Sequence, residues 1–149
     1  MSEGTESTPT EVDVPEGFTA LDRTSPLVEL LGPFYSKGAG AGLVLGLRVA
    51  EKHTNARGFA HGGVLLTLAD VALGYAAEGS VEPAVRLITA SLSADFAGRA
   101  RLGDWVEARA DVQRVGERIA FANTYLHVGN RRIVRASAVF IRTEPDKKA

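Results

Sequence analysis

The chain's most distinctive pattern is a long apolar segment that carries a single acid. From residue 64 to residue 77 the only hydrogen-bonding side chains are those of Thr67, Asp70 and Tyr75. A helix that is apolar on every side is normally buried, so we predict a buried helix over Gly62–Glu78. A lone carboxylate in such a helix is costly unless it is paired, hydrogen-bonded or protonated, and this singles out Asp70.

The residues at the two ends of this helix add to the picture. Gly62 and Gly63 follow His61 at its start, where backbone N–H groups have no partner within the helix and a ligand can approach closely. Gly79 stands where a C′ glycine would end the helix. A helix start that favours anions, together with an isolated acid, indicates a catalytic site.

Apolar and polar positions outside the helix alternate as they do in strands. Two strands are expected before the helix, Phe34–Lys37 and Leu43–Ala50, joined by a flexible hairpin over the glycine-rich residues 38–42. Four strands are expected after it: Leu87–Phe96, Trp105–Val115, Arg118–Val128 and Arg131–Thr143. Residues 116–117 and 129–130 supply the tight turns between the last three strands.

The N-terminal part of the chain is less regular. Residues 1–16 are rich in Ser, Thr, Glu and Pro, and we expect a flexible tail there. Residues 18–31 carry apolar residues at loose helical spacing and predict one or two short helices, interrupted at Ser25-Pro26. Residues 17–149 are then expected to form one domain.

The order of elements limits the architecture. One apolar helix between two strands and four strands must be covered on most sides, which a curved antiparallel sheet wrapped around it achieves. We therefore predict an α+β fold of this kind. Because the sheet cannot close the remaining side alone, a second subunit is expected there.

Composition excludes several classes of function. The net charge is −1 and the sequence pI is about 6.3, so no overall field favours nucleic acid or an anionic membrane. The chain has no cysteine, and its three histidines show no metal-ligand spacing, so we expect neither a metal nor a cofactor. The absence of a signal pattern favours a soluble, cytoplasmic protein.

One string of residues resembles a known family. Its members are Asn55, Gly58, His61, Gly62 and Gly63 at fixed spacing, then Asp70, then Thr89 in a strand that ends at Phe96. The string, within residues 33–143, resembles the hotdog-fold acyl-CoA thioesterases, and is most similar to the phenylacetate-degradation type of the 4-hydroxybenzoyl-CoA thioesterase superfamily. One departure is Arg99, near a place where members often have proline.

The resemblance implies a role for each residue of the string. The Gly62 N–H would donate to the oxyanion, and Asp70 would act as general base or as nucleophile. Thr89 would orient the attacking water, and Asn55 would hold that water or the thioester carbonyl. His61 would anchor the loop or lie near the thiol. Taken singly, each has an ordinary alternative as a turn, packing or structural residue.

The implied substrate is an acyl-CoA, whose phosphates need cationic partners. Candidate partners are Arg99, Arg131 and Arg132, with Arg101 and Arg135 as further arginines. Gly63 is a candidate contact of the coenzyme A portion. For each arginine the alternative is a solvated charged face. The acyl group cannot be deduced, because the aromatic candidates for its pocket serve equally well as core: Phe34, Tyr35, Phe59, Tyr75 and Phe96.

Helix geometry adds an expectation that the resemblance does not. Gly62 and Asp70 are eight residues apart, which is about 12 Å along a helix at about 1.5 Å per residue. One thioester carbon cannot contact both groups from the same helix. We therefore predict composite sites at a homodimer interface, with Asn55, His61 and Gly62 from one chain and Asp70 and Thr89 from the other. Pairing of dimers into a tetramer is frequent in the family.

Two other functions compete with hydrolysis. A hotdog hydratase or dehydratase would act on similar thioesters but uses differently placed His and acid residues. A non-catalytic module that binds or senses acyl thioesters would have no need of Asp70. The chain has no G-x-S-x-G motif, which excludes a serine-hydrolase elbow.

Overall fold

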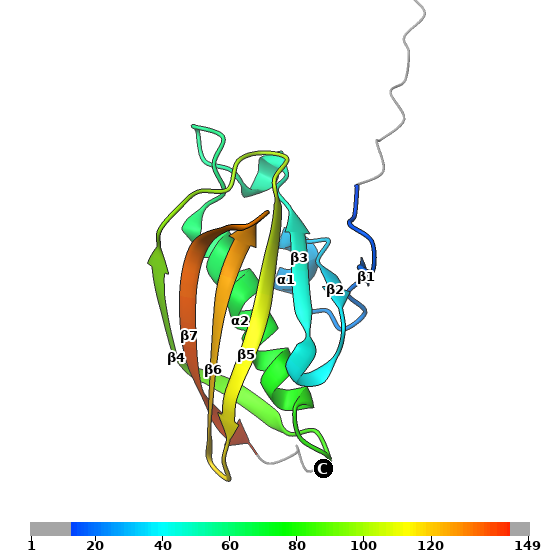
Figure 1. Ribbon diagram of the computed structural model, residues 1–149, viewed down its shortest axis with the longest axis vertical. Coiled ribbons are helices and arrows are strands. Elements are labelled where there is room, and N and C mark those ends of the chain that lie inside the picture. The colour runs from blue at the N-terminus through cyan, green and yellow to red at the C-terminus, as the bar shows by residue number, and fades with distance from the viewer. Residues whose placement is uncertain (1–12, 144–149) are drawn as a thin grey trace, which may run out of the picture.

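The computed structural model describes residues 13–143 of the chain. Its helices are α1 (Pro26–Leu31) and α2 (Gly62–Gly79), with 3₁₀ turns η1 (Gly40–Gly42) and η2 (Glu51–His53). Its strands are β1 (Thr19–Ala20), β2 (Tyr35–Lys37), β3 (Val44–Arg48), β4 (Arg86–Phe96), β5 (Trp105–Val115), β6 (Ile119–Val128) and β7 (Arg131–Thr143). Figure 1 shows these elements in place.

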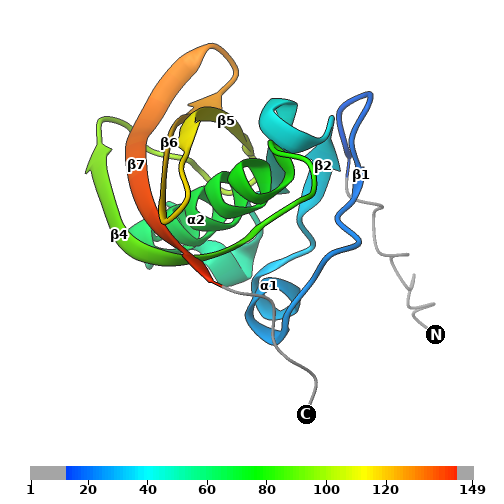
Figure 2. The ribbon, with the colours of Figure 1, turned by 90° about the horizontal axis from the view of Figure 1, so that it is seen from below.

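All strands form one seven-stranded antiparallel sheet in the order β1-β2-β3-β5-β6-β7-β4. The sheet curves around α2, which lies along its concave side, while α1 lies away from the long strands (Figure 2). The predicted α+β fold, a curved sheet wrapped around one long helix, is confirmed. Because β4 is the last strand in this order, the edge that it turns away from β7 has no neighbouring strand within the described residues.

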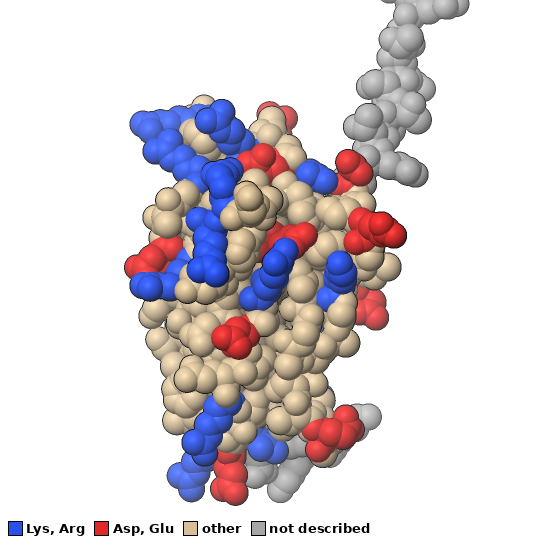
Figure 3. Space-filling view, viewed as in Figure 1, with Lys and Arg blue, Asp and Glu red and all other residues tan. Residues whose placement is uncertain are grey.

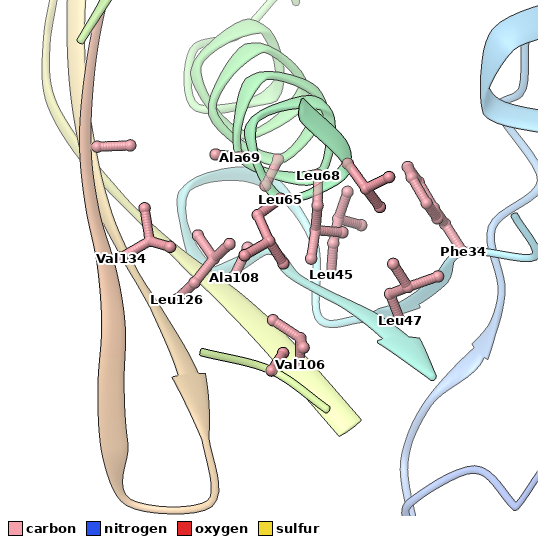
Figure 4. Packing of buried hydrophobic residues seen from close by; sticks show 14 of the residues in the cluster. Phe34, Leu45, Leu47, Leu65, Leu68, Ala69, Val106, Ala108, Leu126 and Val134 are labelled. Carbon is pink, nitrogen blue, oxygen red and sulfur yellow. The ribbon is translucent and has the colours of Figure 1, made fainter. Parts of the chain in front are cut away.

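Small residues allow the sheet to approach the helix closely. Strands β6 and β7 carry several buried alanines. Opposite the sheet, α2 presents alanines and leucines such as Leu65, Leu68 and Ala69 (Figure 4). The fully or almost fully buried members include Leu68, Ala69, Ala72, Ala120, Ala122, Leu126, Ala136 and Ala138. A sheet face lined with alanine can curve tightly without leaving voids, since close packing is what stabilises the core.

The strands predicted after the helix agree closely with the structure. Strands β5 and β7 have the predicted bounds, and β4 and β6 differ by one residue at their starts. In β5, Val106 and Ala108 are buried whereas Arg109 and Asp111 are exposed, as the alternation predicted. The hairpin of β2 and β3 is also confirmed, with shorter strands than expected.

The prediction of a C′ glycine at Gly79 was wrong. Gly79 is the last residue of α2, and Ser80 caps the helix in a right-handed conformation, with φ −79° and ψ −11°. The Ser80 hydroxyl donates to the Ala77 carbonyl at 2.8 Å, so no left-handed residue is needed. A side chain at Gly79 would instead meet Gly40, 3.3 Å from its Cα.

The prediction for residues 18–31 was partly wrong. Residues 19–20 pair with β2 as a short strand, and only Pro26–Leu31 is helical. Ser25 is the N-cap and accepts from the Val28 N–H, so Ser25-Pro26 begins the helix instead of interrupting one. Proline suits the first helical turn because its missing N–H has no partner there.

Residues 1–12 of the predicted tail lie outside the described part of the chain. Within residues 13–143, neither helix is long and apolar enough to cross a membrane.

Candidate active site

The acid singled out by the sequence has one clear partner. The Thr89 hydroxyl donates to Asp70 Oδ1 at 2.7 Å, which joins the middle of α2 to β4. A β-bulge follows Thr89, because Thr89 pairs with Phe140 of β7 and Ser91 pairs with the next residue, Val139. The extra residue changes which side chains of β4 face inward, so both Thr89 and Leu92 can face α2. The structure thus brings two predicted site residues together.

One side of α2 is left partly open in this single chain, as the order of the elements predicted. A stripe of α2 is only partly covered, and it includes Gly63, Leu66, Thr67, Asp70 and Val71. The curved sheet and the N-terminal segment leave this side open (Figure 2). Asp70 therefore lies at a partly exposed face next to the free edge of β4, where a substrate or a second subunit can reach it.

The start of α2 carries unpaired donors. His61 is the N-cap residue, and its carbonyl accepts from the N–H groups of Val64 and Leu65. Within residues 13–143 the N–H groups of Gly62 and Gly63 have no acceptor. Such N–H groups at the positive end of a helix favour a developing negative charge.

The Phe96 ring lies close to position 62. A Cβ built on Gly62 would lie 3.2 Å from two ring atoms of Phe96, the last residue of β4. A Cβ on Gly63 would meet nothing within 4 Å. The two glycines therefore differ: Gly62 is held against an aromatic ring, whereas Gly63 has open space beside it. The His61 side chain is exposed and makes no capping hydrogen bond.

Asn55 organises the loop that leads into α2. Its side-chain oxygen accepts from the N–H groups of Arg57 and Phe59, at 2.9 and 3.3 Å. Its backbone N–H donates to the Phe59 carbonyl. Within the described chain the Asn55 side-chain NH₂ group has no acceptor. Asn55 thus acts as a turn residue, as its ordinary alternative role predicted. The two N–H donors of its side-chain amide are still available to a ligand.

A buried histidine, which the sequence did not single out, supports the same loop. His53 is 1% exposed. Its Nδ1 accepts from the Ala50 N–H at 2.8 Å, and its Nε2 hydrogen-bonds the Leu31 carbonyl, which fixes Nε2 as the protonated nitrogen. Burial lowers the pKa of His53 below its ordinary value of 6.5. Its carbonyl accepts from the His61 N–H, so His53 helps to place the helix start.

Arginines gather at the same end of the molecule. Arg99 and Arg101 lie over the Phe59 ring, 4.9 and 5.5 Å from its centroid. In Figure 3 the Lys and Arg side chains concentrate at the end where the loop before α2 meets residues 97–104. Within residues 13–143, neither Arg99 nor Arg131 pairs with a carboxylate, whereas Arg132 stacks over Tyr125. Arg135 is bound by Asp95, which raises the pKa of the guanidinium further.

The predicted site residues therefore fall into two groups. Asn55, His61 and Gly62 lie at the start of α2 with the arginines, and Asp70 lies with Thr89 about 12 Å further along the helix. Within the described residues, no cluster of three or more His, Asp or Glu side chains could hold a metal ion.

Sequence comparison identifies the family. The family model of the thioesterase superfamily matches residues 57–135, which include the helix start, Asp70, Thr89 and the arginines. The chain belongs to the thioesterase superfamily. This membership favours thioester hydrolysis over the hydratase and over the non-catalytic binding module.

Similar proteins agree with this assignment. A Pseudomonas aeruginosa protein named "Putative esterase PA0474" is 52% identical over 130 residues, which are 87% of this chain and 97% of that one. A mutant of the phenylacetic acid degradation protein PaaI from Thermus thermophilus is 25% identical, with a TM-score of 0.71, over 80% of this chain and all of that one. The prediction of a hotdog thioesterase of the phenylacetate-degradation type is confirmed.

A third similar structure contains a ligand. A Streptococcus mutans protein solved with acetyl-CoA bound is 19% identical, with a TM-score of 0.69, over 93% of this chain and 98% of that one. At this identity the likeness shows the shared fold.

Proposed function

We propose that this thioesterase hydrolyses an acyl-CoA at two composite sites in a homodimer. In each site one protomer supplies Asn55, His61 and the Gly62 N–H, and its partner supplies Asp70 and Thr89. The observation that carries the proposal is the separation of unpaired donors at the start of α2 from the Asp70–Thr89 pair on its open side.

The free edge of β4 supports this dimer. The outer edge of the eleven-residue strand β4 has no neighbouring strand within residues 13–143, and it lies beside the open side of α2. A long edge strand of this kind is a pairing surface. Antiparallel pairing of two β4 edges would continue the sheet across the dimer and place two α2 helices side by side. A twofold axis would make the interface the same for both protomers.

The contacts within one chain support a particular position for that axis. Two contacts join α2 to β4, one in each half of the site. Asp70 contacts Thr89, and Gly62 lies against Phe96. On α2, the residue midway between Gly62 and Asp70 is Leu66. A twofold axis near Leu66 and the centre of β4 would place Asp70 of one protomer opposite Gly62 of its partner.

The chemistry follows from these groups. The carbonyl oxygen of the thioester accepts from the Gly62 N–H, and the charge that develops on it is stabilised by the helix start. Asp70, oriented by Thr89, takes a proton from water as that water attacks, or attacks the carbonyl itself. In the first route the carbon–sulfur bond then breaks, Asp70 passes its proton to the departing sulfur, and the free acid and the coenzyme A thiol leave. In the second route coenzyme A leaves first, and water then hydrolyses the mixed anhydride on Asp70 and supplies the proton for the thiol.

The arginines near the start of α2 would bind the coenzyme A phosphates. Arg99 lies over Phe59, beside the loop that holds Asn55 and His61. Arg131 and Arg132 are the first residues of β7, and Arg132 stacks over Tyr125. Guanidinium groups suit phosphate because they donate two parallel hydrogen bonds. The open space at Gly63 leaves room for the coenzyme A portion to pass.

Thiol release from a panel of acyl-CoAs tests the activity. The panel covers aryl, short, medium and long acyl groups, and Asp70→Asn is the control. We expect free coenzyme A from at least one class with the wild type and almost none with the variant. Binding without turnover across the whole panel would contradict the proposal.

A further inference from the structure

A second acid on α2 lies in surroundings that normally disfavour a carboxylate. Glu78, one residue before the end of the helix, is 7% exposed. Burial penalises its charge, and so does the negative end of the helix dipole. An acid in such a place must be held by specific partners. Arg23 donates to its Oε1 at 2.9 Å, and the Leu87 N–H donates to its Oε2 at 3.1 Å.

These contacts form part of a regular series between α2 and the start of β4. The Val85 N–H donates to the Glu78 carbonyl at 3.1 Å, the Leu87 N–H donates to the Glu78 carboxylate, and the Thr89 hydroxyl donates to Asp70. Every second residue from 85 to 89 is therefore bound to the helix.

The register of the pairing between β4 and β7 is interrupted after Thr89. The β-bulge between Thr89 and Ser91 breaks the ladder directly after this threonine. Residues 86–89 pair with β7 in a short run of four residues that ends at the bulge. The position of Thr89 along α2 therefore depends on these four pairs and on the contacts of this run with the helix. Leu87, two residues earlier, is fixed to α2 by the Glu78 side chain.

We propose that Glu78 is a positioning residue that holds β4 in register so that Thr89 meets Asp70. This proposal rests on the proposed function, in which Asp70 and Thr89 act together. The Leu87 N–H is the contact that transmits the effect. Arg23 balances the charge of Glu78, and its guanidinium also lies 3.9 Å from the centroid of the Tyr75 ring.

Two nearly isosteric variants separate positioning from stability. Glu78→Gln keeps an oxygen that accepts from the Leu87 N–H, whereas Glu78→Met removes it. For Glu78→Met we expect kcat per folded enzyme to fall about tenfold with KM within about twofold, because the reacting groups are misplaced but the substrate still binds. Glu78→Gln should keep kcat within about twofold of the wild type.

A double-mutant cycle with Thr89→Val tests the route of the effect. If Glu78 acts through Thr89, Glu78→Met should lower kcat by less than about twofold in the Thr89→Val background. Full additivity of the two losses would overturn the proposal, and so would an unchanged kcat in Glu78→Met. If Glu78→Met does not fold, Glu78→Ala carries the same predictions.

Hydrogen exchange gives a readout that does not depend on activity. Amides of residues 85–91 should exchange faster in Glu78→Met than in Glu78→Gln or Arg23→Met, which keep the acceptor for Leu87. Equal exchange in the three variants would contradict the positioning role. If the wild type turned over no acyl-CoA of the panel, the proposed function would be contradicted instead. The failure of the positioning role and the failure of the proposed function are therefore distinguishable.

Discussion

Two carboxylates eight residues apart on α2 are held in opposite ways. Asp70 lies on the open side of the helix, and within the described part of the chain its carboxylate has one hydrogen-bond partner, the Thr89 hydroxyl. Glu78 is buried and bound by Arg23 and by the Leu87 N–H. The comparison separates polar groups that the fold has satisfied from groups that it leaves available to a ligand. Loss of the first kind should lower stability, and loss of the second should lower catalysis. Glu78 is expected to affect both, because it also positions Thr89 through the Leu87 N–H.

The largest effect is expected at Asp70. Asp70→Asn removes the base or nucleophile, so kcat/KM should fall about 1000-fold. Because Thr89 can still donate to the amide oxygen, the midpoint of thermal unfolding should shift by no more than about 3 °C. Steady-state thiol release and thermal denaturation measure both quantities. A kcat/KM within tenfold of the wild-type value would contradict a catalytic role for Asp70.

His53 and His61 form a similar contrast and give the next largest effect. His53→Leu leaves the Ala50 N–H and the Leu31 carbonyl without partners, so the free energy of unfolding should fall by about 2 kcal/mol. His61→Ala removes an exposed side chain and should cost less than about 0.5 kcal/mol. Urea denaturation compares them, and equal costs would contradict the structural role of His53.

The same contrast predicts a dependence on pH. Burial lowers the pKa of His53 in the folded chain, so the unfolded chain binds a proton more readily below pH 6.5. The contribution of neutral His53 is complete above pH 6.5 and is lost as the pH falls towards the folded-state pKa. The pKa of His127 is also lowered, by burial and by Arg109 and Arg132, and acts in the same direction. His53→Leu should therefore reduce the slope of stability against pH below 6.5, not abolish it.

The two glycines at the start of α2 give a smaller effect. In Gly62→Ala the added methyl group lies 3.2 Å from the Phe96 ring, so the ring or the helix start must shift by a few tenths of an ångström. If the helix start shifts, the N–H is misplaced, and we expect kcat to fall about tenfold. In Gly63→Ala the methyl group has open space, and any effect should appear in KM. Kinetics of both variants on one acyl-CoA make the comparison. Equal losses in kcat would contradict the role of Gly62.

The smallest effect is expected at the exposed arginines. Arg99→Ala should raise KM about threefold with little change in kcat, because an exposed ion pair to phosphate is worth up to about 1 kcal/mol. Arg118, before the start of β6, is a control, and Arg118→Ala should leave KM unchanged. Added salt should weaken the dependence on Arg99. If both variants behave alike, the arginines near α2 are only a solvated face.

Patterns within short stretches predicted most of the fold. The apolar run of α2 and the alternation in β5 and β7 each depend on nearby residues, so these elements were found with nearly correct bounds. The bounds failed at Gly79 and Ser25, where a serine cap decided the helix end instead of the expected glycine or break.

The satisfied polar groups could not be predicted, because their partners are far away in sequence. Glu78 pairs with Arg23, and His53 with Leu31. Neither pair leaves a local pattern. The separation of Gly62 from Asp70 was easier to predict, because both lie on one helix, where spacing converts directly into distance. The roles of the site residues came from the family resemblance and stay a prediction. The contact between Phe96 and Gly62 could not be predicted from the sequence, because it depends on how β4 packs against α2.

The most direct test of the composite site mixes two inactive variants. Asp70→Asn and Asn55→Ala damage opposite halves, so a mixed dimer has one site with both defects and one intact site. With equal amounts and complete subunit exchange, half of the dimers are mixed, and activity should recover to about a quarter of the wild type. No recovery, although mass spectrometry shows the mixed dimer, would contradict sites shared between two chains.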